Sequence, residues 1–356
     1  MISIFKIQSM SKLKTNYMGI ELKNPVILGA SNLVRNLDTL RKAEDAGIAA
    51  VVFKSLFEEQ IQLESFQLDE KLSEFNDLHS EMISIHPNIE HSGPEEHLHN
   101  IRKTRETLSI PLIASLNAVN NETWLKYAGL LSQTGIDAIE LNFYQIPLDF
   151  NKNSAEIEDE QLNILREIKK NSTIPVSVKL SPNYSNVLNF VKRLDEAGVD
   201  AVVLFNSFFQ PDIDIESEKH KRSSHLSHTG DYKKSLRYSG LFFGNLKADI
   251  CGTHGIFSGE DVIKLLLAGA SCIQIVSTVY RNGVSHISNI IGELEAWMES
   301  KNYNSVEEFR GKLSNKKIVN DPFIYKRAQY VDMLLNSDEL MAGGTNSRIS
   351  HPDGIH

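Results

Sequence analysis

The sequence of this 356-residue chain predicts an α/β fold, a (β/α)8 TIM barrel with insertions at the C-terminal rim of its strands. The first observation behind this prediction is a repeated joint, in which a glycine ends a helix and a small residue opens a buried strand. Four copies occur, as DAGIAAV (Asp45 to Val51), TGIDAI (Thr134 to Ile139), EAGVDAV (Glu196 to Val202) and LAGASCI (Leu267 to Ile273). Such repetition is typical of consecutive βα units.

The second observation is the number of short, β-branched apolar runs bounded by turn residues, since eight is the number that a closed parallel barrel needs. We predict strands at Val26–Ala30, Ala50–Lys54, Leu112–Leu116, Ala138–Phe143, Val176–Leu180, Ala201–Phe205, Asp249–Gly252 and Ile273–Ser277. Apolar residues at helical spacing predict helices at Leu37–Ala46, Trp124–Gln133, Ile157–Lys170, Val187–Ala197, Asp261–Ala268 and Ile287–Ser300. The alternation of strands and helices favours crossover connections and a buried parallel sheet.

Two gaps between predicted strands are too long for a simple βα connection. They span about 57–109 and 208–246, and both follow the C-terminal end of a strand. Long loops in compact domains are often lids or caps, so we interpret both gaps as insertions at the rim. We expect one domain over residues 10–335 and a flexible tail over residues 336–356, where glycine, serine and asparagine are frequent.

Composition limits the classes of function. The chain is 41% hydrophobic and 23% charged, and its formal charge of -9 argues against a basic surface for nucleic acid or for an anionic membrane. No apolar run resembles a signal peptide or a membrane span, so we expect a cytoplasmic protein that acts on a small molecule. Cys251 and Cys272 lie in apolar strand-like runs and are expected to be buried free thiols.

Polar side chains follow the predicted strands at the ends where a barrel places its active site. Lys179 in VSVKLSP is the most informative, because an ammonium on an apolar strand is costly unless it meets an anion or an electron-rich ring system. The alternative is a lysine that reaches solvent beyond the rim. After strands seven and eight, GTHGIFSGED and VSTVYRNG offer backbone N–H groups and a hydroxyl suited to a phosphate, although a simple turn explains either segment alone.

The order of these segments resembles the class 1 dihydroorotate dehydrogenase family of FMN-containing barrels, in particular its divergent dehydrogenase-like branch. The resemblance runs from about Thr15 to about Trp297 and is carried by YMGIELKNPVILGAS, VVFKS, IELNF, VSVKL, VLFNS, GTHGIFSGED and LLLAGASCIQIVST. It implies an FMN cofactor whose ring, ribityl chain and phosphate contact Ala30, Ser31, Lys54, Ser55, Asn142, Lys179, Gly255 and Ser277. It implies substrate binding by Lys54, Asn142, Asn206 and Ser207, and a homodimer by analogy.

The loop after strand four departs from the family. Class 1 enzymes use a cysteine of this loop as the base that removes a substrate proton, whereas NFYQIP places Gln145 there, beside Tyr144. Glutamine cannot act as a base, and a tyrosine, with an ordinary pKa of about 10, is a better proton donor than acceptor at neutral pH. We therefore name Tyr144, Lys54 and Gln145 as candidate catalytic residues, with the alternative that Tyr144 only packs over the pocket.

The predicted function is an FMN-dependent oxidoreductase acting on CH–CH bonds, similar to the enzymes that convert dihydroorotate to orotate in pyrimidine biosynthesis. The substrate would be dihydroorotate or a related anionic unsaturated compound. Alternatives are a flavin-dependent alkene or pyrimidine reductase with Tyr144 as proton donor, a lyase that forms a Schiff base on Lys179, and a flavin-binding protein without catalysis.

Histidines and basic residues in the two insertions invite other interpretations. His79, His86, His91, His97 and His99 crowd the first insertion, but without the spacing of a zinc site, so we expect solvated lid residues and no metal. The basic run Lys219 to Arg222 in the second insertion is expected to meet an anionic substrate or partner rather than nucleic acid.

Overall fold

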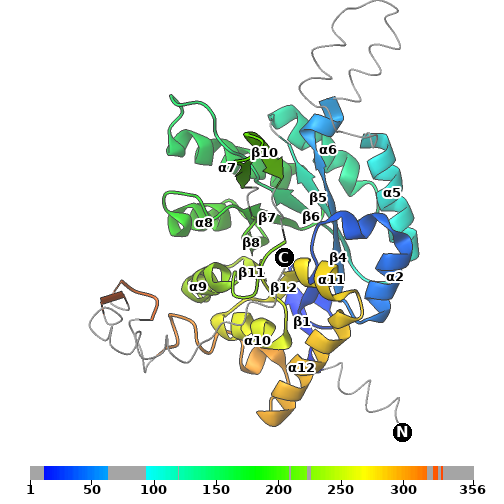
Figure 1. Cartoon of the computed structure of the whole chain (residues 1–356), viewed down its shortest axis with the longest axis vertical. Coiled ribbons are helices and arrows are strands. Elements are labelled where there is room, and N and C mark those ends of the chain that lie inside the picture. Colours follow the sequence, from blue (N-terminus) through cyan, green and yellow to red (C-terminus); the bar gives the residue numbers. More distant parts are fainter. Residues whose placement is uncertain are drawn as a thin grey trace, which may run out of the picture.

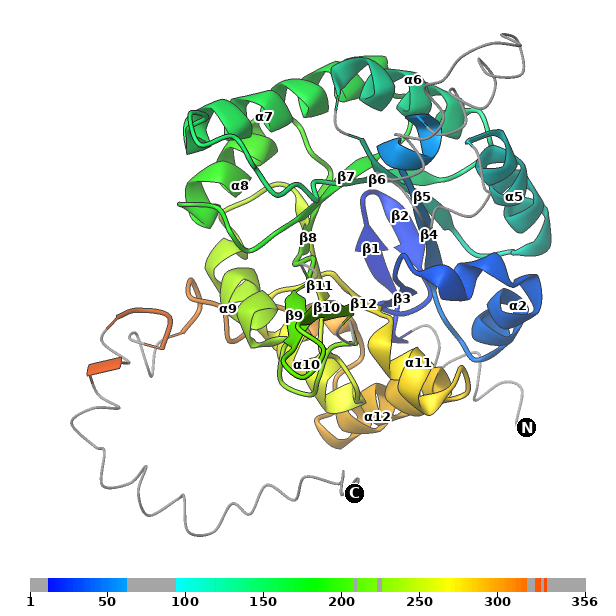
Figure 2. The same ribbon diagram turned by 45° about the horizontal axis from the view of Figure 1, so that its top comes forward.

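The computed structural model describes residues 12–62, 94–118, 120–207, 210–222, 226–318, 324–327 and 330–331. Its centre is a closed barrel of parallel strands with helices around it (Figures 1 and 2). The strands follow the order β3-β4-β5-β6-β7-β8-β11-β12, and β12 pairs with β3 to close the ring. The predicted fold class is therefore confirmed. The predicted tail, residues 336–356, lies outside the described residues.

All eight predicted strands are present in the barrel. They are β3 (Val26–Leu28), β4 (Ala50–Phe57), β5 (Leu112–Asn117), β6 (Ala138–Asn142), β7 (Val176–Leu180), β8 (Ala201–Leu204), β11 (Asp249–Thr253) and β12 (Cys272–Ile275). The last strand ends before the predicted Ser277, because the short helix α11 (Ser277–Asn282) begins there. Apart from Phe57 at the end of β4, the apolar side chains of the barrel strands are buried, as expected for a sheet covered on both faces.

The helices form the outer layer. They are α2 (Leu37–Asp45), α5 (Pro94–Thr107), α6 (Asn121–Ser132), α7 (Ser154–Asn171), α8 (Val187–Glu196), α9 (Lys233–Phe242), α10 (Gly259–Ala268), α11 and α12 (His286–Ser300), with 3-10 turns η1 (Asn32–Arg35) and η2 (Val306–Glu308). The six predicted helices are confirmed, whereas α5 and α9 were missed. Their buried faces include His97, Thr104, Ser235 and Ser239, so the apolar period is weak. Both helices lie in the predicted insertions, which are correspondingly shorter.

The repeated joint has the conformation that its glycines predict. All four have positive φ, at Gly47, Gly135, Gly198 and Gly269. In the two copies that carry an aspartate after the glycine, Asp137 and Asp200 accept a hydrogen bond from the first backbone N–H of β5 and β7, at 2.8 and 2.7 Å. The motif thus ends a helix and fastens the new strand to its neighbour.

A hairpin fills the N-terminal end of the barrel. It consists of β1 (Thr15–Tyr17) and β2 (Ile20–Leu22), and Figure 2 shows it within the ring of strands. Tyr17 and Leu22 pack against an interior cluster that contains Cys251 and Cys272, both buried and both free, as predicted. Because this end is filled, the polar C-terminal ends of the strands are left as the open end of the barrel.

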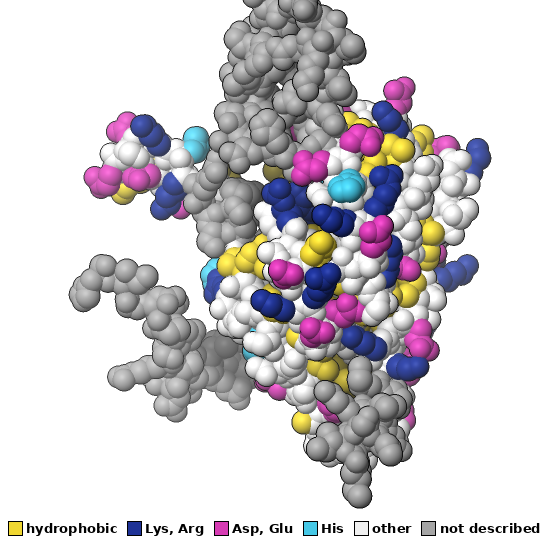
Figure 3. Space-filling model, turned by 90° about the vertical axis from the view of Figure 1, so that its right-hand side faces the viewer, with side chains coloured by type: hydrophobic (Ala, Val, Ile, Leu, Met, Phe, Trp, Pro, Cys, Tyr) yellow, Lys and Arg dark blue, Asp and Glu magenta, His cyan; other side chains and the backbone are white. Residues whose placement is uncertain are grey.

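A second hairpin, β9 (Pro211–Asp214) and β10 (Lys219–Arg222), was not predicted. Lys221 Nζ lies 3.1 Å from Asp212 Oδ2 across it, so part of the basic run is paired within its own hairpin. Figure 3 shows basic and acidic side chains interspersed over one face of the molecule. Among the described helices, none combines the length and the apolar character that crossing a membrane requires.

Candidate active site

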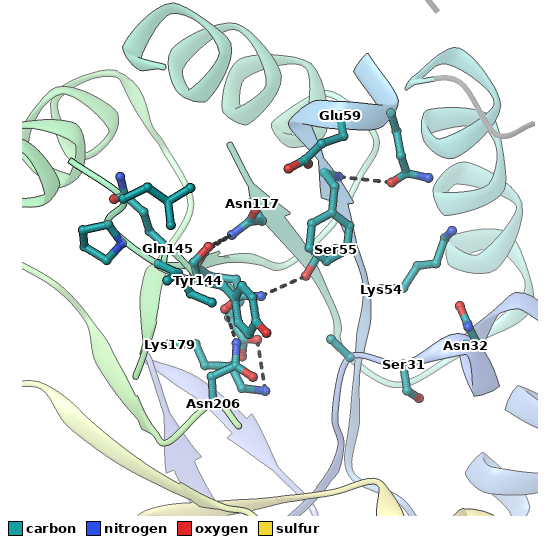
Figure 4. Close-up of a pocket in the computed structure, with 18 of the residues that line it drawn as sticks. Ser31, Asn32, Lys54, Ser55, Glu59, Asn117, Tyr144, Gln145, Lys179 and Asn206 are labelled. Carbon is teal, nitrogen blue, oxygen red and sulfur yellow. Dashed lines mark hydrogen bonds and ion pairs between the residues drawn. The ribbon is translucent and has the colours of Figure 1, made fainter. Parts of the chain in front are cut away.

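A cavity of about 1330 Å³ opens at the C-terminal end of the strands (Figure 4). The predicted site residues in its lining are Ala30, Ser31, Lys54, Ser55, Asn142, Tyr144, Gln145, Lys179 and Asn206. A smaller cavity of about 190 Å³ shares Ala30, Lys179 and Asn206 with the first and is also lined by Ser207, Gly255 and Ser277. The structure thus brings every predicted site residue to one of two adjoining cavities.

Lys179 forms part of the floor and does not extend into solvent. It is 9% exposed, so the alternative of a lysine beyond the rim is wrong. Its Nζ donates to Gln274 Oε1 at 3.1 Å and lies 3.9 Å from Glu140 Oε1. The sequence did suggest an anion near this ammonium, but Glu140 was not recognised. The sequence did contain a signal for Glu140: it is an acidic residue on an otherwise apolar strand, and it lies two residues before Asn142, so both side chains point to the same face of the strand.

Side-chain amides and hydroxyls form a connected row above the floor. Asn142 Oδ1 accepts from Asn206 Nδ2 at 2.6 Å, and Asn142 Nδ2 lies 3.4 Å from Ser55 Oγ. Ser55 Oγ and Ser115 Oγ are 2.7 Å apart. Each carboxamide carries two N–H donors, so these contacts leave Asn142 and Asn206 donors with which to orient a ligand. The network holds both amides in fixed directions.

Lys54 and Arg35 give another wall of the cavity a positive character. Burial lowers the pKa of Lys54, the charge of Arg35 lowers it further, and Glu96 acts in the opposite direction. No carboxylate of the described residues is within ion-pair distance of Lys54. Figure 4 shows Lys54 beside Ser31 and Asn32, across the cavity from Tyr144, Lys179 and Asn206. A half-buried lysine with no carboxylate partner in the described part of the chain favours an anionic ligand.

His97 lies buried on α5, where its ring meets the edge of Phe53 with centroids 5.3 Å apart. Burial, and then the charge of Lys54, lower the pKa of His97 to about 3. The prediction of solvated histidines is therefore wrong for His97, although His99 is exposed. His79, His86 and His91 lie outside the described residues. Within the described ranges, no group of three or more potential ligand side chains could hold a metal ion.

The loop after β6 places Tyr144 at the cavity and Gln145 at its exposed mouth. The backbone of Tyr144 is fixed, because its N–H donates to the Asn142 carbonyl at 2.8 Å and its carbonyl accepts from Asn117 Nδ2 at 3.2 Å. Cys251 and Cys272 line neither of the two cavities. The chain therefore offers a tyrosine hydroxyl, and not a thiol, for proton transfer at this loop.

The two groups predicted to hold a phosphate converge on Ser227, which sequence reasoning missed. The Gly255 N–H donates to Ser227 Oγ at 3.0 Å, and the N–H and Oγ of Ser227 lie 3.0 and 2.8 Å from Ser277 Oγ. Nothing in the local sequence marks Ser227, since it lies between β10 and α9, far from both partners in the chain. A backbone N–H and two hydroxyls form a donor set suited to an anion.

His254 stands beside this donor set with φ 77°. Its Nε2 is 3.6 Å from Asp231 Oδ2, and burial lowers the pKa of His254 while the charge of Asp231 opposes that shift. A residue with a side chain is therefore accommodated in the left-handed region at this turn, next to Gly255. The backbone donor of Gly255 is retained.

The residues present fit FMN. Lys179, a buried cation, lies where the two cavities adjoin, and the smaller cavity also has the N–H and hydroxyl groups around Gly255 and Ser277 in its lining. Ser31 belongs to the lining of the larger cavity, and its Oγ is buried and makes no hydrogen bond with any described residue, as expected of a hydroxyl that a ligand would satisfy. These features make the C-terminal ends of the strands the candidate active site of the barrel.

Comparison with known proteins identifies the family. The family model for dihydroorotate dehydrogenase matches residues 12–298. The catalytic subunit of dihydroorotate dehydrogenase B (NAD(+)) from Thermoplasma volcanium is 30% identical over 311 residues, covering 85% of this chain and 98% of the relative. The subunit of the same name from Methanocaldococcus jannaschii is 28% identical over 312 residues, covering 84% and 97%. The PreA subunit of NAD-dependent dihydropyrimidine dehydrogenase from Escherichia coli K12 is 24% identical over 365 residues, covering 97% and 86%.

The chain belongs to the dihydroorotate dehydrogenase family. Members of this family are flavin-dependent dehydrogenases, so both the predicted resemblance and the predicted enzyme class are confirmed. At identities of 24 to 30%, the relatives leave the substrate open.

Proposed function

We propose that this protein is an FMN-dependent oxidoreductase that acts on a CH–CH bond of a small anionic unsaturated compound, dihydroorotate or a relative of it. The observation that carries the proposal is the joined cavity, with Lys179 in its floor, Lys54 in its wall and the Asn142–Asn206 amide pair between them. When bound, FMN supplies a site that accepts or donates hydride. The protein itself supplies binding, orientation and proton transfer.

The proposed cofactor roles are those that the family resemblance implies, and the positions of the side chains around the two cavities support them. Ala30, Ser31, Lys54, Ser55, Asn142 and Lys179 would hold the flavin ring and ribityl chain, and Gly255 and Ser277 the phosphate. We add Ser227 to the residues proposed to bind the phosphate, because its hydroxyl bridges Gly255 and Ser277. A lysine ammonium beside the ring favours the reduced cofactor, because reduction adds negative charge to the N1–C2 edge.

We assign substrate binding to the wall that contains Lys54 and to the row of side-chain amides formed by Asn142 and Asn206. Lys54 would bind the anionic group, and Asn142, Asn206 and Ser207 would orient the substrate through hydrogen bonds. Fixed donors of this kind place the reacting carbon at the ring and reduce the entropy lost in the reaction. Dihydroorotate oxidation would place the protein in pyrimidine biosynthesis, and we propose a cytoplasmic homodimer by analogy with the family.

A reductase is the second candidate, and Tyr144 favours it. Oxidation of dihydroorotate requires a base, yet no thiol lines the cavities and Gln145 cannot take a proton. Tyr144 could instead donate a proton to one carbon of an activated alkene or pyrimidine while the other carbon receives hydride. The similarity to a subunit named for dihydropyrimidine dehydrogenase is consistent with a pyrimidine ring as substrate.

A Schiff-base lyase has less support. The amine of Lys179 must be free and neutral to attack a carbonyl, whereas here it donates to Gln274 and lies near the carboxylate of Glu140. Both contacts engage the amine that a Schiff base would consume. Trapping of a carbonyl substrate on Lys179 with borohydride would contradict this argument.

The test is an absorption spectrum of the gently purified protein, followed by anaerobic addition of dihydroorotate. Flavin bands that bleach would support dihydroorotate oxidation without a cysteine base. The reductase would be supported if dihydroorotate leaves the flavin bands unchanged and if, after chemical reduction of the flavin, an unsaturated pyrimidine restores these bands. A flavoprotein that exchanges hydride with neither would be a binding protein, and a protein without flavin that cannot be reconstituted would contradict the proposal.

A further inference from the structure

Glu140 is a buried carboxylate that the proposed chemistry does not use. It lies on β6 with 1% of its surface exposed, yet it belongs to the lining of the large cavity. A carboxylate in a barrel interior is costly unless a cation or several hydrogen bonds compensate it. Its position below the proposed ring site calls for a functional explanation.

The contacts of Glu140 connect it to Lys179 through a single amide. Glu140 Oε2 accepts from Gln274 Nε2 at 2.5 Å, and Gln274 Oε1 accepts from Lys179 Nζ at 3.1 Å. Glu140 Oε1 has no hydrogen-bond partner among the described residues and lies 3.9 Å from Lys179 Nζ. The carboxylate and the ammonium are thus held close together without a direct hydrogen bond between them.

The amide between them has little freedom to move. Gln274 is 1% exposed, and an added Cβ on Gly29 would lie 3.3 Å from Gln274 Oε1 and 2.9 Å from a methyl group of Val276. The backbone therefore packs closely against the amide. With both ends of the amide hydrogen-bonded, its orientation fixes the positions of the carboxylate and the ammonium together.

We propose that Glu140 is a positioning residue that fixes Lys179 through Gln274 and offsets its charge, and thereby lowers the reduction potential of bound FMN. The inference rests on the proposed function, because it requires FMN above Lys179. A carboxylate 3.9 Å from the ammonium, in an interior of low dielectric constant, cancels much of the field that the ammonium exerts on the ring. Removal of the negative charge would leave that field uncompensated and would favour the reduced, more negative ring.

The experiment compares the midpoint potential of bound FMN in the wild-type protein, Glu140→Gln and Glu140→Met. Both variants remove the charge, and they differ in whether a polar side chain remains beside Gln274. We expect each variant to bind reduced FMN at least tenfold more tightly relative to oxidised FMN, which corresponds to an upward shift of about 30 mV for a two-electron couple. We also expect both variants to bind sulfite at least tenfold more tightly, because its adduct with the flavin carries negative charge on the same ring edge.

Ser177→Ala is the matched control. Ser177 is buried on β7, two residues before Lys179, and its hydroxyl donates to the Ile139 carbonyl, so the variant disturbs the same interior without changing charge. It should keep the wild-type potential and sulfite affinity. A potential that stays constant or falls in both Glu140 variants would overturn the inference, and so would a shift in only one of them. Wild-type protein unable to bind FMN would instead contradict the proposed function, so the two failures are distinguishable.

Discussion

His97 gives a quantitative prediction about stability in acid. The imidazole lies on α5 against Phe53, with 1% of its surface exposed, and neither ring nitrogen has a hydrogen-bond partner among the described residues. A protonated ring at this position would be a buried cation near Lys54. The folded protein therefore excludes the proton, whereas the unfolded chain binds it at the ordinary pKa. We predict that His97→Leu makes the protein less sensitive to acid.

The magnitude follows from the two pKa values. The pKa of His97 is lowered from 6.5 to about 3 by burial and by Lys54. Above pH 6.5 both states hold a neutral ring, and His97 does not affect the pH dependence. As the pH falls below 6.5 the unfolded state gains a proton that the folded state refuses, so folding loses about 1.4 kcal/mol per pH unit. At pH 5 the expected loss is about 2 kcal/mol.

The assay is urea unfolding of the wild type and His97→Leu at pH 7.5 and pH 5. The difference in unfolding free energy between the two proteins should change by about 2 kcal/mol in favour of the variant when the pH is lowered. His99→Leu is the matched control, because His99 lies on the same helix and is exposed. It should keep the wild-type pH dependence. If His97→Leu shifts the free energy equally at both pH values, the ring titrates normally in the folded state and the reasoning is refuted.

Four further predictions concern the cavity and the barrel. Lys54→Met should weaken binding of orotate by about 1.5–3 kcal/mol, roughly 10- to 150-fold, in a spectral titration, whereas Arg41→Met on the exposed face of α2 should not. Because burial lowers the pKa of Lys54, orotate affinity should decline at a lower pH than for an exposed lysine, as the ammonium loses its proton. Tyr144→Phe should lower turnover about 10²–10⁴-fold with FMN still bound, and unchanged turnover would assign Tyr144 to packing. Asp200→Ala should lower the unfolding free energy by about 1–3 kcal/mol in urea, because it removes the oxygen that accepts the first N–H of β7 at 2.7 Å and that pairs with Lys169, and an unchanged urea midpoint would contradict this role.

Much of the site was predictable, because residues at the C-terminal ends of barrel strands lie close together in space. Lys54, Asn142 and Lys179 each stand at or near the end of an apolar strand, and parallel strands in a closed barrel bring these ends together. Ser227 was not predictable in this way, since it belongs to an irregular segment and reaches Gly255 and Ser277 only in the folded chain. The resemblance to the family assigned roles to residues but did not reveal this bridge.

The architecture was predictable from the amino-acid sequence, because the signals for helices and strands are local. A glycine that ends a helix and a short β-branched run recur within single βα units. The same local rules missed α5 and α9, because side chains such as His97 and Ser235 complete their buried faces and weaken the apolar period.

The charge environment of the cavity floor depends on contacts between residues that are far apart in the sequence, and it could be read only from the tertiary structure. Glu140, Lys179 and Gln274 belong to three different strands, and β6 lies across the closed barrel from β12. Charge and hydrogen bonding act through space, so no spacing along the chain records that these side chains meet. Closure of the barrel brings them within 4 Å of one another and places an acid beside the lysine that strand pattern alone had marked for a ligand.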